Sequence, residues 1–260
     1  MIAPNTRRYQ STVFFVAGLA SMVACALVTF RFIYSGHTTY VSLVWNLFLA
    51  WIPWFLALFA ENSCRKAGRV TFLVALCGLA WLLFFPNAPY IVTDFLHLQA
   101  LPPIPMWFDL FLLFSFAWAG LFLGFSSLYT MQRLVTEKLG RILGWLFTLV
   151  VLALSSFGIY LGRFLRWNSW DVLLDPRGLA GDVLSRLAHP TAYPRTYAVS
   201  FLATVVFAAV YLTLYALAQM PREGEEGCSK LQVAGCKLRA QEQEVEGQRD
   251  GETGWHGKGA

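Results

Sequence analysis

A polar set interrupts an apolar stretch of the chain at residues 84–98, which read FFPNAPYIVTDFLHL. Asn87, Tyr90, Asp94 and His97 follow one another at intervals of three, four and three residues, so on a helix they fall within an arc of roughly 80°. A carboxyl group and an imidazole on one face can act as general acid and base. We therefore expect Asp94 and His97 to be the catalytic candidates, with Asn87 and Tyr90 beside them to bind a substrate.

Two arginines and a second aspartate extend this candidate site. Arg163 and Arg166 lie three residues apart in GRFLRWNSWD, residues 162–171, and Asp109 lies about one turn into an apolar stretch. A guanidinium group matches phosphate and carboxylate bidentately. If the helix that carries Arg163 continues, both arginines share a face, and we expect them to bind an anionic substrate group. Asp109 is a further candidate for substrate binding.

A metal site is the alternative use of such residues. Asp94 and His97, with Asp109 or Asp171, could offer a mixed shell of oxygen and nitrogen ligands. One aspartate and one histidine are a weak metal signature, and the five cysteines show no metal-ligand spacing. We therefore predict no metal site and name no cofactor. The signatures GxxxxGK[ST], HExxH, GxSxG and CxxC are absent from the sequence, so it leaves open whether the protein is an enzyme.

Long apolar runs must position these residues. The chain is 57% hydrophobic and only 13% charged, about half the charged share of an average soluble domain. The runs approach the roughly 20 residues that a membrane-spanning helix needs, and they are continuous rather than alternating. The sequence therefore predicts an all-α bundle of six transmembrane helices. The six runs are Ser11–Phe30, Tyr40–Ala60, Val70–Phe85, Leu110–Thr130, Ile142–Gly162 and Tyr197–Met220.

Loop charges predict the orientation of this bundle, because short cytoplasmic loops are rich in Lys and Arg. Basic residues occur at 7–8, 65–69 and 133–141, whereas the loops 35–39 and 86–104 contain none. This pattern places both termini in the cytoplasm and the polar set on the outer side. The loop after the fifth run breaks the pattern with five arginines, for which its aspartates are partial partners. The net charge of +5 thus reflects topology, and we expect no nucleic-acid partner.

Prolines suggest how the polar set is held. We expect Pro86 to end the third and shortest helix, and Asn87 to cap a new helix with Pro89 in its first turn. This second helix would be amphipathic, since its other faces are apolar. It is therefore predicted to lie at the outer interface or to form a re-entrant element.

Three further patterns concern packing and domain organisation. Gly120-xxx-Gly124 and Gly158-xxx-Gly162 place small residues one turn apart and predict close helix contacts inside the bundle. Asp182 and Arg186 are expected to pair at i, i+4 on a short surface helix. Residues 221–260 are rich in Glu, Gln, Gly and Lys, so a disordered cytoplasmic tail is expected after a transmembrane domain of residues 1–220.

The stretch FFPNAPYIVTDFLHL resembles the signature of an uncharacterised family of bacterial multi-pass membrane proteins, catalogued as domain of unknown function 1361. The resemblance is close over Phe85–Asp94 and extends over residues 40–215. It implies a location in the bacterial cytoplasmic membrane and no particular activity.

The leading hypothesis from the residues is an outward-facing polar pocket that binds or processes an anionic lipid or a lipid-linked headgroup. One alternative is a passive or lipid transporter, although no apolar run holds an ionisable group near its centre. Another is a non-catalytic assembly or accessory protein of the membrane. The polar set could also be purely structural, with Asp–Arg pairs that lock neighbouring loops.

Overall fold

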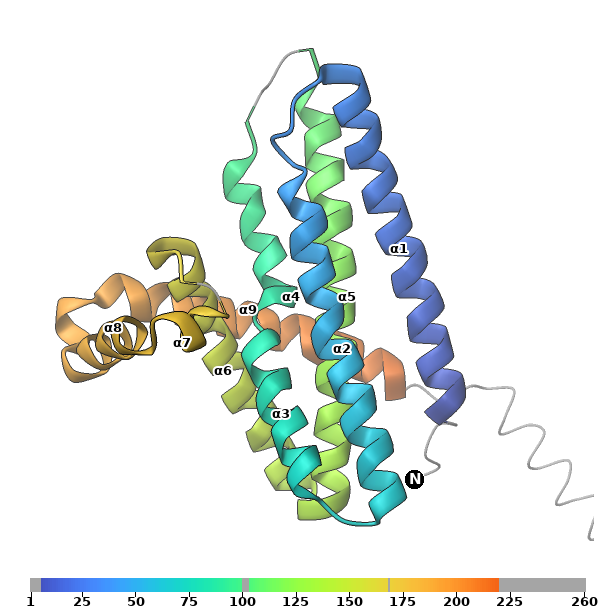
Figure 1. Ribbon diagram of the computed structural model, residues 1–260, viewed down its shortest axis with the longest axis vertical. Helices are drawn as coiled ribbons and strands as arrows, with labels where there is room; N and C mark the ends of the chain where they lie inside the picture. The colour runs from blue at the N-terminus through green and yellow to red at the C-terminus, as the bar shows by residue number, and fades with distance from the viewer. Residues whose placement is uncertain (1–5, 100–102, 168, 220–260) are drawn as a thin grey trace, which may run out of the picture. The chain divides into compact units, whose positions relative to one another are not determined.

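The computed structural model describes residues 6–99, 103–167 and 169–219, and these contain helices and no strand (Figure 1). Six of the described helices are long and apolar enough to cross a membrane. This confirms the all-α architecture with six spans, and the protein is an integral membrane protein. The spans are α1 (Thr6–Ser35), α2 (Ser42–Ala67), α3 (Phe72–Phe84) continued by α4 (Asn87–Tyr90) and η1 (Ile91–His97), α5 (Met106–Leu139), α6 (Arg141–Leu165) and α9 (Pro194–Gln219). The connection from α6 to α9 contains α7 (Asp171–Leu174), α8 (Pro176–Ala188) and η2 (Pro190–Ala192).

Residues 1–212 form one compact unit, and a second unit, 213–260, is described only over the end of α9. The predicted tail at 221–260 therefore lies outside the described residues. Within the first unit, α5 packs against α1, α2 and α6, and Figure 1 shows α1, α2 and α5 side by side. Leu112, Phe116 and Leu123 of α5 are fully buried in this contact.

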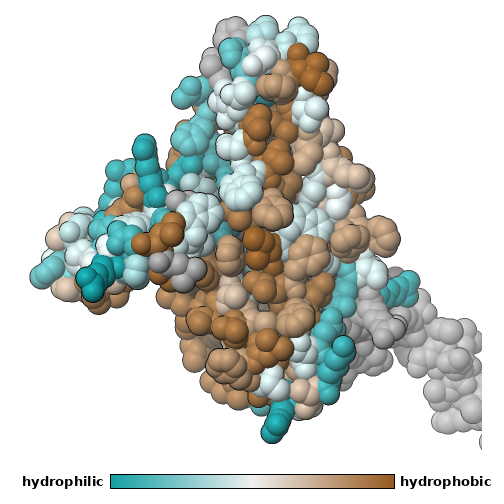
Figure 2. Space-filling view, viewed as in Figure 1, coloured by the Kyte–Doolittle hydropathy of each residue, from teal (hydrophilic) through white to brown (hydrophobic). Residues whose placement is uncertain are grey.

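Large apolar side chains cover the outer faces of the bundle (Figure 2). Phe15, Phe72 and Ile142 are examples, with 72%, 85% and 85% of their side chains exposed. A soluble protein rarely exposes large continuous apolar surfaces. Lipid is therefore the solvent that these helices face.

A polar cluster ties α1, α2 and α5 together around Glu61, which is buried near the end of α2. Its carboxylate accepts hydrogen bonds from Gln10 at 2.9 Å, from Arg65 at 3.1 Å and from Arg133. A carboxylate that is paired and hydrogen-bonded in this way can be buried at an acceptable energetic cost. The cluster therefore fixes the arrangement of three helices at the end of α2 that lies away from the polar set.

α3 ends at Phe84 and α4 begins at Asn87, which confirms the predicted helix end at Pro86. The backbone nevertheless stays helical there, and one candidate span runs from Phe72 to His97. Pro86 keeps helical dihedral angles of −59° and −24°. The backbone N–H of Phe85 donates to the carbonyl of Trp81 at 2.7 Å, and that of Tyr90 donates to Pro86 at 3.0 Å. The polar set therefore lies on α4 and on the 3₁₀ turns of η1, which continue the third candidate span.

Two side chains bond backbone carbonyls beside the proline-containing turn. The Asn87 amide donates to the carbonyl of Phe84 at 3.0 Å, and the Ser169 hydroxyl donates to that of Leu83 at 3.2 Å. Proline is tolerated in membrane helices when side chains and local 3₁₀ turns satisfy backbone groups around it. Asn87 is not the N-cap that the sequence suggested; it is the first residue of α4, and its side chain bonds the carbonyl of Phe84.

Small residues on α5 bring the third span close. A Cβ atom added at Gly120 would lie 2.7 Å from the carbonyl oxygen of Ala88 and 2.8 Å from the side chain of Ile91. One added at Gly124 would lie 2.9 Å from the Cβ of Ala88. Any side chain at these two positions would push α4 away from α5, so the close contact predicted for this pair is confirmed.

The second glycine pair holds the opposite side of the same segment. A Cβ atom added at Gly158 of α6 would lie 3.5 Å from the ring of Pro86, and one added at Gly162 would lie 3.4 Å from the ring of Tyr90. The PNAPY segment therefore lies between the glycine faces of α5 and α6. This packing sets the rotation of η1, and with it the direction in which Tyr90 and Asp94 point.

Candidate functional site

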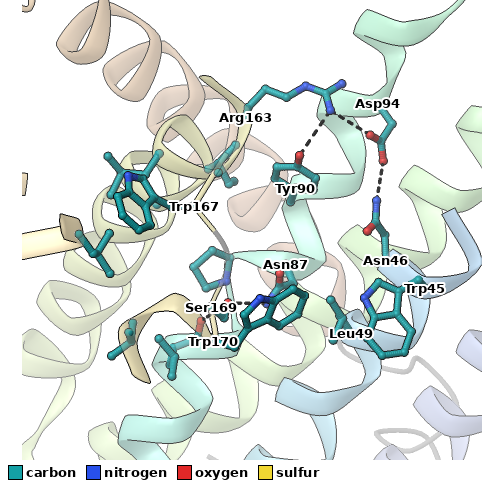
Figure 3. A pocket seen from close by; sticks show the side chains of 18 of the residues that line it. Trp45, Asn46, Leu49, Asn87, Tyr90, Asp94, Arg163, Trp167, Ser169 and Trp170 are labelled. Atoms are coloured by element: carbon teal, nitrogen blue, oxygen red, sulfur yellow. Dashed lines mark hydrogen bonds and ion pairs between the residues drawn. The ribbon is translucent and has the colours of Figure 1, made fainter. Parts of the chain in front are cut away.

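A cavity of about 430 Å³ lies beside the third span (Figure 3). α2 lines it on one side, and the end of α6, α7 and α8 line it on the other. Its lining combines polar groups with tryptophan and leucine side chains. The polar residues include Asn46, Asn87, Tyr90, Asp94, His97 and Arg163. The apolar residues include Trp45, Leu49, Leu82, Leu83, Trp167 and Trp170.

An ion pair between Arg163 and Asp94 crosses one wall of this cavity. Arg163 Nη1 donates to Asp94 Oδ1 at 3.2 Å and to the Tyr90 hydroxyl at 3.4 Å, while Nη2 donates to the carbonyl of Thr93. Asn46 holds the other carboxylate oxygen, with its amide nitrogen 3.1 Å from Asp94 Oδ2. Each of the paired side chains is 9% exposed. Three helices thus converge on one carboxylate: α2, η1 and α6.

Asn87 lies along the same face of the third span as this ion pair. Its amide nitrogen donates to the Ser169 hydroxyl at 3.1 Å as well as to Phe84, and Figure 3 shows the link to Ser169. Ser169 lies just before α7. Ser169 therefore ties the connection after α6 to the third span beside the cavity.

His97 is the last residue of η1; it is exposed and lines the cavity. Its backbone carbonyl accepts a hydrogen bond from the Tyr40 hydroxyl at 3.3 Å. Burial and the nearby Asp109 carboxylate raise the pKa of Tyr40 above its ordinary value, so this hydroxyl stays protonated as a donor. The contact fixes the end of η1 while leaving the imidazole of His97 free of that bond.

Asp109 lies in a different ion pair and does not line the cavity. Arg31 Nε and Nη2 donate to its two carboxylate oxygens at 2.6 and 3.0 Å, and the two side chains are 1% and 0% exposed. The ring of Tyr40 covers the guanidinium, with 4.5 Å between Cζ and the ring centroid. Asp109 therefore joins α5 to α1 and is not brought together with the other candidate residues.

Arg166 is also separated from the cavity, because α6 ends at Leu165. Arg166 adopts the left-handed conformation with φ of 64°, which is uncommon for a residue with a side chain. It is exposed and is not among the lining residues. Arg163 and Arg166 thus do not share a helix face. Of the predicted residues, the structure gathers Asn87, Tyr90, Asp94, His97 and Arg163 around the cavity.

The family model described as "Protein of unknown function (DUF1361)" matches residues 45–212. The chain belongs to this family. The matched region contains every residue that lines the cavity except Ser42, and it leaves out α1. No curated protein and no solved structure matches the chain. The family match thus includes nearly the whole cavity lining, but the family description names no activity.

Several residues of this family region reach the cavity without having been predicted as site residues. Asn46 gives the clearest sequence signal, since a lone asparagine in an apolar span suggests a polar contact between helices. Trp167 and Trp170 are typical of membrane interfaces, and this pattern alone does not indicate a cavity. Ser169 carries no distinguishing signal. Within the described part of the chain, no group of three or more His, Cys, Asp and Glu side chains could hold a metal ion.

The short surface helix predicted around Asp182 is confirmed as α8, and it borders the cavity through Leu179. Arg186 Nη1 lies 3.1 Å from Asp182 Oδ1, which confirms the predicted pair. The indole nitrogen of Trp167 donates to Asp182 Oδ2 at 2.7 Å. Asp182 thus connects α8 with the aromatic wall of the cavity.

Proposed function

We propose that this membrane protein binds an anionic lipid or a lipid-linked headgroup in the cavity, with Arg163 holding the anionic group. The observation that carries the proposal is a guanidinium group that lines a cavity between membrane-spanning helices. Arginine forms bidentate hydrogen bonds with phosphate. Three of its N–H groups are used by Asp94, Tyr90 and Thr93, and a guanidinium group carries five.

The rest of the lining supports an amphiphilic ligand. Leu49, Leu82 and Leu83 come from membrane spans, and they lie beside polar groups in one continuous lining. Trp167 and Trp170 add rings of the kind that sits at the level of lipid headgroups. The volume of about 430 Å³ falls within the range of small-molecule sites, roughly 300–1,000 Å³. A headgroup with the start of its acyl chains matches this mixture of surfaces.

Processing of the bound headgroup is the second part of the proposal. Asp94 and His97 lie one turn apart in η1, and both line the cavity. Carboxyl and imidazole groups are the usual general acids and bases. In this role the exposed His97 exchanges a proton with the ligand, while Asp94 stays bound to Arg163 and Asn46.

We also propose that the protein resides in a bacterial cytoplasmic membrane with both termini in the cytoplasm, so that the cavity opens outward. The Lys and Arg distribution of the short loops supports this orientation. A topology reporter fused after Gln219 is expected to report the cytoplasm, and one inserted within residues 177–182 the periplasm. The reverse result for both fusions would place the cavity on the cytoplasmic side.

Lipid retention by variants tests the proposed ligand. The full chain is purified in a mild detergent, and mass spectrometry measures the phospholipid retained per protein. Arg163→Gln is expected to lower retention on the order of tenfold, corresponding to about 1.4 kcal/mol. Arg166→Gln is the matched control, because it removes the same charge three residues away, outside the cavity, and should retain lipid normally.

Loss of folding must be separated from loss of binding in this experiment. Arg163→Gln leaves the Asp94 carboxylate without its cation, so the double variant Asp94→Asn with Arg163→Gln is included to restore charge neutrality. The double variant should fold as well as the unaltered protein and still lack the lipid. Equal retention by the unaltered protein, Arg163→Gln and Arg166→Gln would refute the proposed function.

A further inference from the structure

The cavity contains an arginine and an aspartate in contact, and its lining is therefore close to electroneutral. Among the described lining residues, Arg163 is the cationic side chain and Asp94 the anionic one. Their nitrogen and oxygen atoms are 3.2 Å apart. A site built only for an anion has no need of a carboxylate at this position. The presence of Asp94 beside Arg163 thus indicates a second feature of the ligand, in addition to its anionic group.

A phosphate bound to Arg163 necessarily lies close to Asp94, because both groups contact the same guanidinium. Two negative charges at such a distance repel each other, and the repulsion is strong where burial keeps water away. The 9% exposure of both side chains means that little water screens this repulsion. A positive charge on the ligand, next to its phosphate, would neutralise the carboxylate.

Hydrogen-bond acceptors around Asp94 match a primary ammonium group. Asn46 donates its amide N–H to the carboxylate, so its side-chain carbonyl is the atom that it can offer to a ligand. His97 lines the cavity one turn further along η1, and a neutral imidazole contains one acceptor nitrogen. Carboxylate, amide oxygen and imidazole together suit the three N–H donors of a primary ammonium.

We propose that the preferred ligand is a phospholipid whose headgroup carries a primary ammonium beside its phosphate, with the phosphate on Arg163 and the ammonium on Asp94. This inference rests on the proposed function, from which it keeps the phosphate on Arg163, and it narrows the ligand from anionic lipids in general to those whose phosphate is accompanied by an ammonium. A net anionic headgroup leaves the carboxylate unneutralised. A quaternary ammonium has no N–H groups, so it leaves the acceptors of Asn46 and His97 unpaired.

Competition between lipids of different headgroups tests the inference. The full chain is delipidated in neutral detergent and mixed with equal amounts of phosphatidylethanolamine, phosphatidylglycerol and phosphatidylcholine that carry the same acyl chains. Native mass spectrometry then counts each bound lipid. Phosphatidylethanolamine is expected to exceed each of the others on the order of tenfold. In Asp94→Asn this preference over phosphatidylglycerol should disappear, whereas Glu137→Gln, a half-exposed carboxylate outside the cavity lining, should keep it.

The lipid preference of the unaltered protein already tests the inference, so the result does not depend on the folding of a variant. If phosphatidylglycerol binds as well as phosphatidylethanolamine, and Arg163→Gln weakens both, the proposed function stands and the ammonium inference fails. If phosphatidylcholine binds best, the aromatic rings rather than Asp94 recognise the cation, and the inference fails as well. If no lipid depends on Arg163, the inference falls together with the proposed function.

Discussion

Two arginine–aspartate pairs join helices in this molecule, and they differ in how completely the protein encloses them. Arg31 and Asp109 make two hydrogen bonds, at 2.6 and 3.0 Å, and are at most 1% exposed. Arg163 and Asp94 make one contact at 3.2 Å, are 9% exposed and line a cavity. The protein encloses the first pair completely, although Arg31 Nη1 has no hydrogen-bond partner among the described residues.

Both members of the second pair, Arg163 and Asp94, also form hydrogen bonds with neighbouring groups, and they line the cavity. Arg163 distributes its N–H groups over a carboxylate, a hydroxyl and a backbone carbonyl. Networks of this kind are stable in the resting protein and can accept a ligand that brings complementary charges. Enclosure, rather than the presence of an ion pair, therefore distinguishes a structural lock from a candidate site in this protein.

The strongest test of the comparison removes the enclosed carboxylate. Asp109→Asn leaves the buried Arg31 guanidinium without its counter-charge and is expected to lower the free energy of unfolding by about 3–5 kcal/mol. Thermal unfolding of the purified full chain in detergent measures the loss. The double variant Arg31→Met with Asp109→Leu should recover most of the stability, because apolar residues can replace a buried pair. A loss below about 1 kcal/mol for Asp109→Asn would show that the enclosed pair is not a lock.

The next largest effect is expected from Gly120→Ala, which moves the helix of the open pair without changing a charge. The new Cβ would lie 2.7 Å from the carbonyl of Ala88, and such overpacking costs about 1–3 kcal/mol. Gly18→Ala in α1 is the control, because nothing lies within 4 Å of its added Cβ. The same unfolding assay should show a loss for Gly120→Ala and none for Gly18→Ala. Equal stability of both variants would contradict the close packing of α4 on α5.

Asp94→Asn should cost less than Asp109→Asn, about 1 kcal/mol. Arg163 keeps its bonds to Tyr90 and Thr93, and the new amide oxygen can still accept a hydrogen bond. Parallel thermal unfolding of the two asparagine variants measures the difference. If both lose the same stability, the pair at the cavity is as much a structural element as the enclosed pair, and the distinction between them fails.

The smallest effect is expected for His97→Gln, within about 0.5 kcal/mol of the unaltered protein. The imidazole is exposed, and the Tyr40 hydroxyl bonds the backbone carbonyl of residue 97, which the substitution retains. If His97 processes the ligand, the variant should keep its stability while any turnover of the lipid stops. A loss above about 1 kcal/mol would identify His97 as a packed structural residue.

Much of the fold follows from composition and spacing. Lipid requires long uncharged helices, so the six spans are visible as runs in the sequence. The glycine pairs predict close contacts because small residues one turn apart allow helix backbones to approach. The sequence does not show which segment of the chain packs against both glycine pairs. That the PNAPY segment lies between Gly120 and Gly162 depends on the packing of three spans.

The candidate site was harder to predict, because partner choice depends on how each helix is rotated. Asp109 and Arg31 are 78 residues apart, and nothing in their local sequence favours this pairing over one with Arg163. Arg166 fell outside the site because a left-handed residue ends α6 before the shared face forms. The helix end at Pro86 could be predicted from the proline itself. That the backbone stays helical there could not, because Asn87 and Ser169 bond neighbouring carbonyls only once the helices have packed.

The bond from Ser169 to the carbonyl of Leu83 has a consequence for how the chain is assembled. The two residues are separated by 86 positions. A ribosome that adds about 5–20 residues per second delivers the serine roughly 4–17 s after the leucine. During that interval the carbonyl of Leu83 lacks this hydrogen bond. This contact of the proline-containing span can therefore form only after the fifth span and the segment behind it have been synthesised.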